Sequence, residues 1–276
     1  MTPAVLPGQE TLLACWTALA RLSPGARIHH DPAAAAAVFP SWTPLNNAIV
    51  LGGPGLTAAN RVASVYREAG VDLWALWLPS RVTDLDAPDR VGEIGALKRD
   101  TTTLVMRATL PAGLRHDGRV VRTSIATATR AGDEPVPVAD LGEPDRVPGL
   151  NAWALVHDGQ AVAAAWTFVH RSDCGIYAAG TVPAMRRRGF ARALGEHALA
   201  DAWRAGARTA SLQSTRMGRP LYESLAFEAV GRYEEWVSVP SPTRSPERHP
   251  SRRSRRPPST GEPMAARDVV SQGGPT

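Results

Sequence analysis

The feature that most constrains the fold is a change in the spacing of apolar residues, from strand-like to helix-like, between residues 175 and 205. Residues 175–182 are apolar, carry β-branched and aromatic side chains and end at Pro183, which predicts a short buried strand. A helix is expected from Gly189 to about Ala205, because apolar residues recur there at helical spacing, with arginine and glutamate on the opposite side. The segment between the two, Arg186 to Ala191, is therefore a turn from a strand into a helix.

This turn has the properties of an anion site. The start of a helix leaves backbone N–H groups unpaired and carries a partial positive charge, and Gly189 lets the backbone approach a bulky anion such as a pyrophosphate. The glycine patterns of Rossmann and P-loop sites are absent here. The alternative is a solvated helix start, and Lys98 as the only lysine shows that arginine is favoured along the whole chain.

The net charge of +5 does not indicate nucleic-acid binding, because most of it lies at one end. Residues 240–276 hold seven arginines against three acidic residues, a net of +4, which leaves 5 − 4 = +1 for the rest of the chain. This segment is rich in Pro, Ser and Gly, so we expect a disordered, solubilising tail with weak, salt-dependent affinity for acidic surfaces.

The chain holds Cys15 and Cys174, too few for a disulfide framework and without metal-ligand spacing. We expect no metal site. The first ten residues lack the basic and apolar segments of a leader, and no run of 18 apolar residues occurs. A cytoplasmic protein without membrane contact is predicted.

Strand and helix patterns divide the chain into four parts. The first, 1–122, alternates helix and strand; its expected helices are 10–22, 57–69 and, more weakly, 86–97, and its expected strands are 47–52, 72–78 and 101–110. Residues 123–150 contain four prolines and five acidic residues and are expected to be a linker. Residues 151–239 form the second domain, and 240–276 the tail.

The second domain opens with a hairpin, because Asp158-Gly159 joins the apolar runs 152–157 and 161–170. After the strand, the turn and the helix already described, we expect a strand at 209–213, a short helix at 219–226, and strands at 227–239 broken near Gly231.

This order of elements resembles the GNAT superfamily of acyl-CoA-dependent N-acyltransferases. Their pyrophosphate loop, Gln/Arg-x-x-Gly-x-Gly/Ala, is matched by Arg186, Gly189 and Ala191, and their Leu-Tyr-x-x-Leu-Gly-Phe helix by Leu221, Tyr222, Leu225 and Phe227. The resemblance covers residues 151–239. It implies an α/β (α+β) fold, a mixed and mostly antiparallel twisted sheet flanked by helices. The first half would be a degenerate tandem copy that shapes the acceptor cleft.

The resemblance also implies a reaction and its residues. An acetyl or other short acyl group would pass from acetyl-CoA to a small-molecule or peptide amine by direct attack in a ternary complex. Ala179, Gly180 and Thr181 would pair with the pantetheine arm, Thr215 would touch the cofactor, and Tyr222 would protonate the departing thiolate. The pyrophosphate would be held by the loop, which consists of Arg186, Arg187, Arg188, Gly189, Phe190, Ala191 and Arg192.

Two departures from the family pattern bear on catalysis. Ala226 replaces the glycine before Phe227, and no Asp or Glu occurs in 161–169 or 209–213, where relatives often carry the general base. His170 is a candidate substitute because its pKa suits proton removal near neutrality, and the alternatives are water as the base and an exposed strand-end histidine. A non-catalytic acyl-CoA-binding sensor or scaffold is the alternative function.

Overall fold

A computed structural model of the chain describes residues 5–88, 94–125, 128 and 146–239. These residues belong to one compact unit, Met1–Ser241, while the second unit, Pro242–Thr276, lies outside them. The expected tail and most of the expected linker thus fall outside the described residues. None of the helices in the described ranges is long and apolar enough to cross a bilayer.

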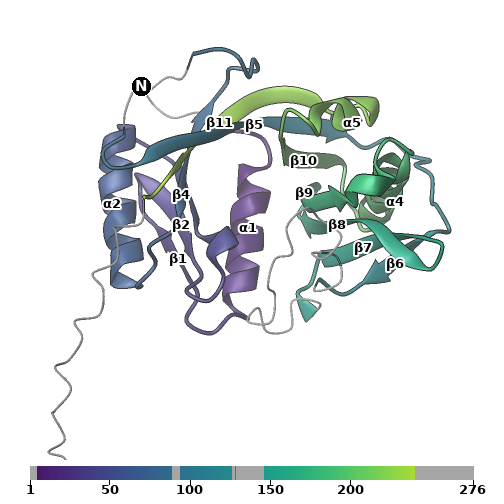
Figure 1. Cartoon of the computed structure of the whole chain (residues 1–276), viewed down its shortest axis with the longest axis horizontal. Coiled ribbons are helices and arrows are strands. Elements are labelled where there is room, and N and C mark those ends of the chain that lie inside the picture. The colour runs from purple at the N-terminus through teal and green to yellow at the C-terminus, as the bar shows by residue number, and fades with distance from the viewer. Residues whose placement is uncertain (1–4, 89–93, 126–127, 129–145, 240–276) are drawn as a thin grey trace, which may run out of the picture. The chain divides into compact units, whose positions relative to one another are not determined.

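One 11-stranded sheet runs through both halves, in the order β1-β2-β3-β4-β11-β5-β10-β9-β8-β7-β6 (Figure 1). Its neighbouring strands are antiparallel except for β3–β4 and β9–β10. The predicted fold class, a mixed and mostly antiparallel sheet flanked by helices, is confirmed. The strands are β1 Arg27–His30, β2 Ala34–Val38, β3 Asn47–Val50, β4 Ala75–Ser80, β5 Lys98–Thr109, β6 Val120–Thr123, β7 Leu150–His157, β8 Gln160–His170, β9 Asp173–Thr181, β10 Thr209–Ser214 and β11 Glu228–Val237.

The helices cover both faces of the sheet. In the first half, α1 packs on one face of β2 through Ala37, while α2 packs on the other through Ala34 and Ala36 (Figure 1). In the second half, α4 covers β7, β8 and β9. The helices are α1 Gln9–Ala20, α2 Gly55–Glu68, α4 Phe190–Arg204 and α5 Arg219–Ser224, with 3-10 turns at Thr43–Leu45 and Pro183–Met185.

Each half repeats the same unit, because β3, α2 and β4 follow one another as β9, α4 and β10 do, and both crossovers join parallel strands. The long strands β5 and β11 then each pair with strands of the other half. β5 lies between β10 and β11, and β11 lies between β4 and β5. The halves are therefore joined by exchanged strands. Sequence periodicity does not predict which strands pair, so this exchange was not expected.

One strand was not expected, and one expected helix is absent. Residues Ala34–Val38 form the fully buried strand β2, because a strand packed between two helices has room only for small side chains. The weak helix expected at 86–97 is absent from its described residues, which form turns and an isolated Ile94–Leu97 bridge. The strands expected at 227–239 are one strand, β11, with a shift of register between Ala229 and Gly231 in place of a break. The remaining expected helices and strands are present with boundaries shifted by a few residues.

Candidate active site

The parallel strands β9 and β10 separate at one end. They pair from Asp173–Thr209 to Ile176–Leu212, and no further pairing between them is present, although β9 continues to Thr181. Backbone N–H and C=O groups on this edge of β9 are thus left without a strand partner. An extended ligand of peptide-like chemistry can pair with the edge in place of a strand.

A bulge shapes the unpaired part of β9. The register with β8 shifts between Ala164 and Trp166, and Ala178 has a φ of 48°. Ala179 is exposed and Gly180 half-buried, so the predicted pantetheine residues lie at the surface of the open edge. A bulge re-aims backbone groups, and here it does so where the strands part.

The turn after β9 is closed by its own backbone and by one arginine. Arg186 donates from Nε to the carbonyl oxygen of Thr181 at 3.2 Å, so this side chain braces the loop. Arg187 has a φ of 62°, which is strained for a residue with a side chain. Arg187, Arg188 and Gly189 are all exposed. The loop thus lies at the surface, where an anion can reach it.

Helix α4 begins at this loop with free donors. Gly189 is its N-cap at a φ of 80°, with no side-chain cap and no acidic residue in the first turn. The first intrahelical bond runs from the Ala193 N–H to the Gly189 carbonyl at 3.0 Å, which leaves the preceding amides without helical acceptors. Phe190 contributes only its backbone, because its ring is buried against His157.

Tyr222 lies beside the turn between β10 and α5. A Cβ built on Gly218 would come within 3.1 Å of Ser214 Oγ, 3.3 Å of Tyr222 Cε2 and 3.6 Å of Thr215 Oγ1. The structure therefore brings Tyr222 and Thr215 together at the end of β10, where β9 and β10 separate. Burial raises the pKa of Tyr222 to about 12, so its hydroxyl keeps its proton at neutral pH.

His170 lies at the opposite end of strands β8 and β9 from the loop. It pairs with Asp173, whereas Thr181 pairs with Ala163, so the two sites are separated by about eight residues of strand, roughly 26 Å. Its imidazole stacks on Phe168 and lies 3.8 Å from the Glu10 carboxylate. The structure does not bring His170 to Tyr222.

Asp173, the carboxylate at the start of β9, is occupied by hydroxyl groups. Thr11, Thr209 and Ser211 each donate to it at 2.7 Å. It also lies at the paired end of β9 and β10, away from Tyr222. A carboxylate with these partners is a structural anchor between α1 and the sheet rather than a free base.

Ala226, where relatives carry glycine, has a φ of 62°. The turn thus keeps the left-handed conformation that glycine adopts easily, and the alanine bears a strain of about 1–2 kcal/mol. Phe227 is buried directly after it, and its ring lies 5.8 Å from that of Tyr222. The substitution strains the turn without abolishing it.

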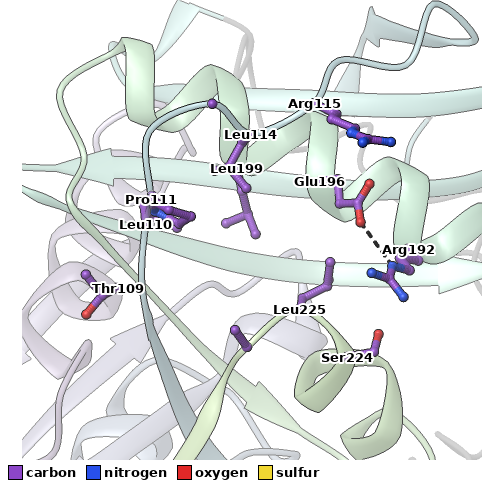
Figure 2. Close-up of a pocket in the computed structure, with 12 residues that line it drawn as sticks. Thr109, Leu110, Pro111, Leu114, Arg115, Arg192, Glu196, Leu199, Ser224 and Leu225 are labelled. Atoms are coloured by element: carbon purple, nitrogen blue, oxygen red, sulfur yellow. Dashed lines mark hydrogen bonds and ion pairs between the residues drawn. The ribbon is translucent and has the colours of Figure 1, made fainter.

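A cavity of about 460 Å³ lies between α4, α5 and the segment after β5 (Figure 2). Its apolar wall is formed by Leu110, Leu199 and Leu225. Figure 2 shows Arg115 and Arg192 on either side of Glu196, which accepts a bond from Arg192 Nε at 3.0 Å. Of the predicted site residues only Arg192 lines this cavity. The segment 109–115 was missed because it comes from the first half and carries no motif.

Comparison with known proteins agrees with these elements. Residues 137–217 match the acetyltransferase (GNAT) domain family; the match begins within the expected linker and ends before Tyr222. No curated protein sequence matches the chain.

Three solved structures share the fold over most of the chain. A GCN5-related N-acetyltransferase from Kribbella flavida is 16% identical with a TM-score of 0.56, covering 86% of this chain and 98% of that one. A putative GNAT-family acetyltransferase from Novosphingobium aromaticivorans is 17% identical with a TM-score of 0.54, covering 82% and 96%. A tandem GNAT protein from the clavulanic acid biosynthesis pathway is 12% identical with a TM-score of 0.51, covering 88% and 98%.

Residues 137–217 therefore match the GNAT acetyltransferase domain family, and most of the chain shares its fold with GNAT structures, one of them a tandem GNAT protein.

Proposed function

We propose that the protein is an N-acyltransferase that moves an acetyl or other short acyl group from acetyl-CoA to an amine by direct attack in a ternary complex. The observation that carries this proposal is the separation of β9 from β10 beside an uncapped helix start. An open strand edge suits an amide-containing arm, and free helix amides suit a pyrophosphate. Acetyl-CoA has both groups.

In this proposal the edge of β9 at Ala179, Gly180 and Thr181 pairs with the pantetheine arm. The amides from Arg187 to Arg192 hold the pyrophosphate, with the exposed guanidinium groups of Arg187 and Arg188 as helpers. Arg186 holds the loop in shape through its bond to Thr181. Backbone donors dominate because they are fixed before the ligand arrives, whereas exposed arginine side chains must be ordered.

The bound co-substrate would supply the acyl group as a thioester. Backbone N–H groups of the β9 bulge would stabilise negative charge on the carbonyl oxygen, and the Tyr222 hydroxyl would donate a proton to the leaving sulfur. The raised pKa of Tyr222 keeps this proton available. Thr215, beside Tyr222, would contact the same part of the ligand.

A covalent acyl-cysteine route is not supported. Cys15 and Cys174 are both buried, and burial raises the pKa of Cys15 to about 12 and that of Cys174 still further. Neither thiol is a nucleophile at neutral pH. With His170 distant and Asp173 occupied, we propose that water removes the proton of the acceptor amine.

The cavity of Figure 2 is proposed to hold the outer, adenosine end of the ligand. It offers an apolar wall for a flat ring and two arginines for a phosphate, and Arg192 connects it to the loop. The Arg115→Ala variant should then weaken CoA binding severalfold and leave the affinity for 4′-phosphopantetheine unchanged. Equal losses for the two ligands would remove the cavity from the site.

The acceptor is proposed to be a small-molecule or peptide amine of the cytoplasm, bound on the side that the first half shapes. Purified protein incubated with acetyl-CoA and a panel of amines, with release of free thiol as the readout, tests the function. Turnover with at least one amine is expected. Measurable acetyl-CoA binding without turnover of any amine would reject the catalytic proposal.

The second candidate is a non-catalytic acyl-CoA-binding sensor or scaffold. It is favoured by the occupied state of Asp173 and the position of His170, which leave these two groups unable to serve as the base. The Tyr222→Phe variant separates the candidates, because an enzyme loses rate while a binding module keeps its affinity and has no rate to lose.

A further inference from the structure

Arg232 on β11 is a buried cation that holds a loop of the first half. Its guanidinium group donates from Nη1 to the carbonyl oxygens of Asp84 and Ala87, and from Nη2 to that of Pro88, each at 2.8 Å. Nη2 also donates to Glu234 Oε1 at 2.8 Å, and both side chains are 0% exposed. The Glu234 carboxylate neutralises the buried charge of Arg232, and the other N–H groups of the guanidinium bind carbonyl oxygens of the loop.

The loop segment 84–88, between β4 and β5, is thereby fixed at three of its five carbonyl groups. Asp84 adds a local bond, since its Oδ1 accepts the Asp86 N–H at 2.9 Å. Leu85 packs against an apolar cluster that includes Phe227 and residues of α4. The segment belongs to the first half in sequence, but it is attached to the second half.

The same segment contacts the β10–α5 turn, which lies between Thr215 and the helix of Tyr222. Asp86 accepts bonds from Arg216 at 2.5 and 3.3 Å, and this ion pair lowers the pKa of Asp86. Arg216 directly follows Thr215 and lies two residues before Gly218, whose carbonyl oxygen accepts the Tyr222 N–H at 3.3 Å. The contact thus reaches the β10–α5 turn from the β11 side, opposite the loop and helix start proposed for the pyrophosphate.

We propose that Arg232 is a positioning residue that holds segment 84–88 as a wall of the acceptor site. This inference rests on the proposed N-acyltransferase function. Since the segment meets the turn at Arg216, past Thr215, and does not meet the β9–α4 loop, it should act mainly on the binding and selection of the amine and leave the pyrophosphate loop unchanged. The planar guanidinium reaches three carbonyls and a carboxylate at once, which a lysine ammonium cannot do.

The experiment compares wild type, Arg232→Lys, Asp86→Arg and the double variant Asp86→Arg, Arg216→Asp with an amine that the wild type acetylates. Arg232→Lys keeps the charge beside Glu234 but loosens the segment, so the KM for the amine should rise about tenfold. Asp86→Arg should raise the KM for the amine severalfold, because it places two arginines together. The double variant restores an ion pair of opposite direction, so its KM for the amine should return toward the wild-type value. The Kd for acetyl-CoA should change less than twofold in all variants.

Glu10→Arg is the matched control, because it breaks an exposed ion pair with Arg171 that resembles the Asp86–Arg216 pair in exposure but lies at the far end of β8 and β9. The inference is overturned if the KM for the amine is unchanged in both Asp86→Arg and folded Arg232→Lys. It is also overturned if these variants lose acetyl-CoA affinity by the same factor by which the KM for the amine rises. If Arg232→Lys does not fold, the two Asp86 variants decide alone. No turnover by wild type with bound acetyl-CoA would instead reject the proposed function, and this inference with it.

Discussion

Replacing Gly189 by alanine tests the loop most sharply, because the structure separates its effect on stability from its effect on binding. Gly189 has a φ of 80°, and a Cβ built there meets nothing within 4 Å. The added methyl group would therefore point into the space that the proposed pyrophosphate fills. The methyl group would not clash with any atom of the protein, so a loss of affinity would come from its effect on the ligand.

The expected magnitudes follow from these two facts. An alanine in the left-handed region costs about 1–2 kcal/mol, and the stiffer unfolded chain returns about 0.4–1 kcal/mol. A net loss of about 1 kcal/mol lowers the Tm of a chain of this size by about 2–4 °C. Losing one charge-assisted hydrogen bond costs about 1.5–3 kcal/mol, which raises the Kd for acetyl-CoA by about tenfold or more.

Gly70 provides a matched control. Its φ is 68°, a Cβ there also meets nothing within 4 Å, and it follows the end of α2, far from the loop in sequence. Thermal unfolding and calorimetric titration with acetyl-CoA should show that Gly70→Ala loses similar stability and keeps its affinity within about twofold. Equal Kd values for the two alanine variants would refute the assignment of the Gly189 backbone to the pyrophosphate.

Three other variants probe single parts of the site. Tyr222→Phe should lower kcat by about 10²-fold or more with an unchanged acetyl-CoA Kd, measured by thiol release, and an unchanged kcat would remove Tyr222 from the mechanism. Because the pKa of Tyr222 is about 12, wild-type kcat should rise with pH as the amine loses its proton and show no falling limb below about pH 10; a falling limb near neutrality would mean another acid. Arg187→Ala should raise the acetyl-CoA Kd by no more than about fivefold, since its exposed guanidinium is only a helper, and a loss as large as that of Gly189→Ala would contradict this division. Ala226→Gly should relieve the φ of 62° and stabilise the protein by about 0.5–1 kcal/mol in thermal unfolding, whereas destabilisation would show that the turn carries no strain.

The parts of the fold that sequence patterns predicted are those set by local chemistry. The Asp158-Gly159 hairpin, the strand before the loop and the helix from Phe190 each follow from turn residues or from hydrophobic period, and each is present. The strand β2 was missed because alanine favours helices, and only the two helices on either side of it explain why small residues are needed there. The exchange of β5 and β11 depends on pairings across more than 100 residues, such as Met106 with Leu212 and Trp77 with Glu235.

In the candidate site, too, the residues that belong to local motifs could be predicted, and those brought in by distant parts of the chain could not. The loop and Tyr222 belong to motifs within one half, so their neighbourhood could be predicted. His170 was placed near the chemistry because histidine is a common general base, but its position along β8 decides its surroundings, and it lies at the wrong end of the strand for contact with Tyr222. Arg115 and segment 84–88 come from the first half, where no motif indicates which residues will meet the second.

The central claim is that acetyl-CoA lies along the open edge of β9 with its pyrophosphate on the start of α4. A crystal structure of the protein with acetyl-CoA tests it most directly. The account predicts pantetheine amides paired with Ala179–Thr181, phosphate oxygens within hydrogen-bond distance of the amides of Arg187–Arg192, and sulfur next to the Tyr222 hydroxyl. Acetyl-CoA bound at the equivalent turn of the first half, residues 52–55, with the β9 edge empty, would contradict it.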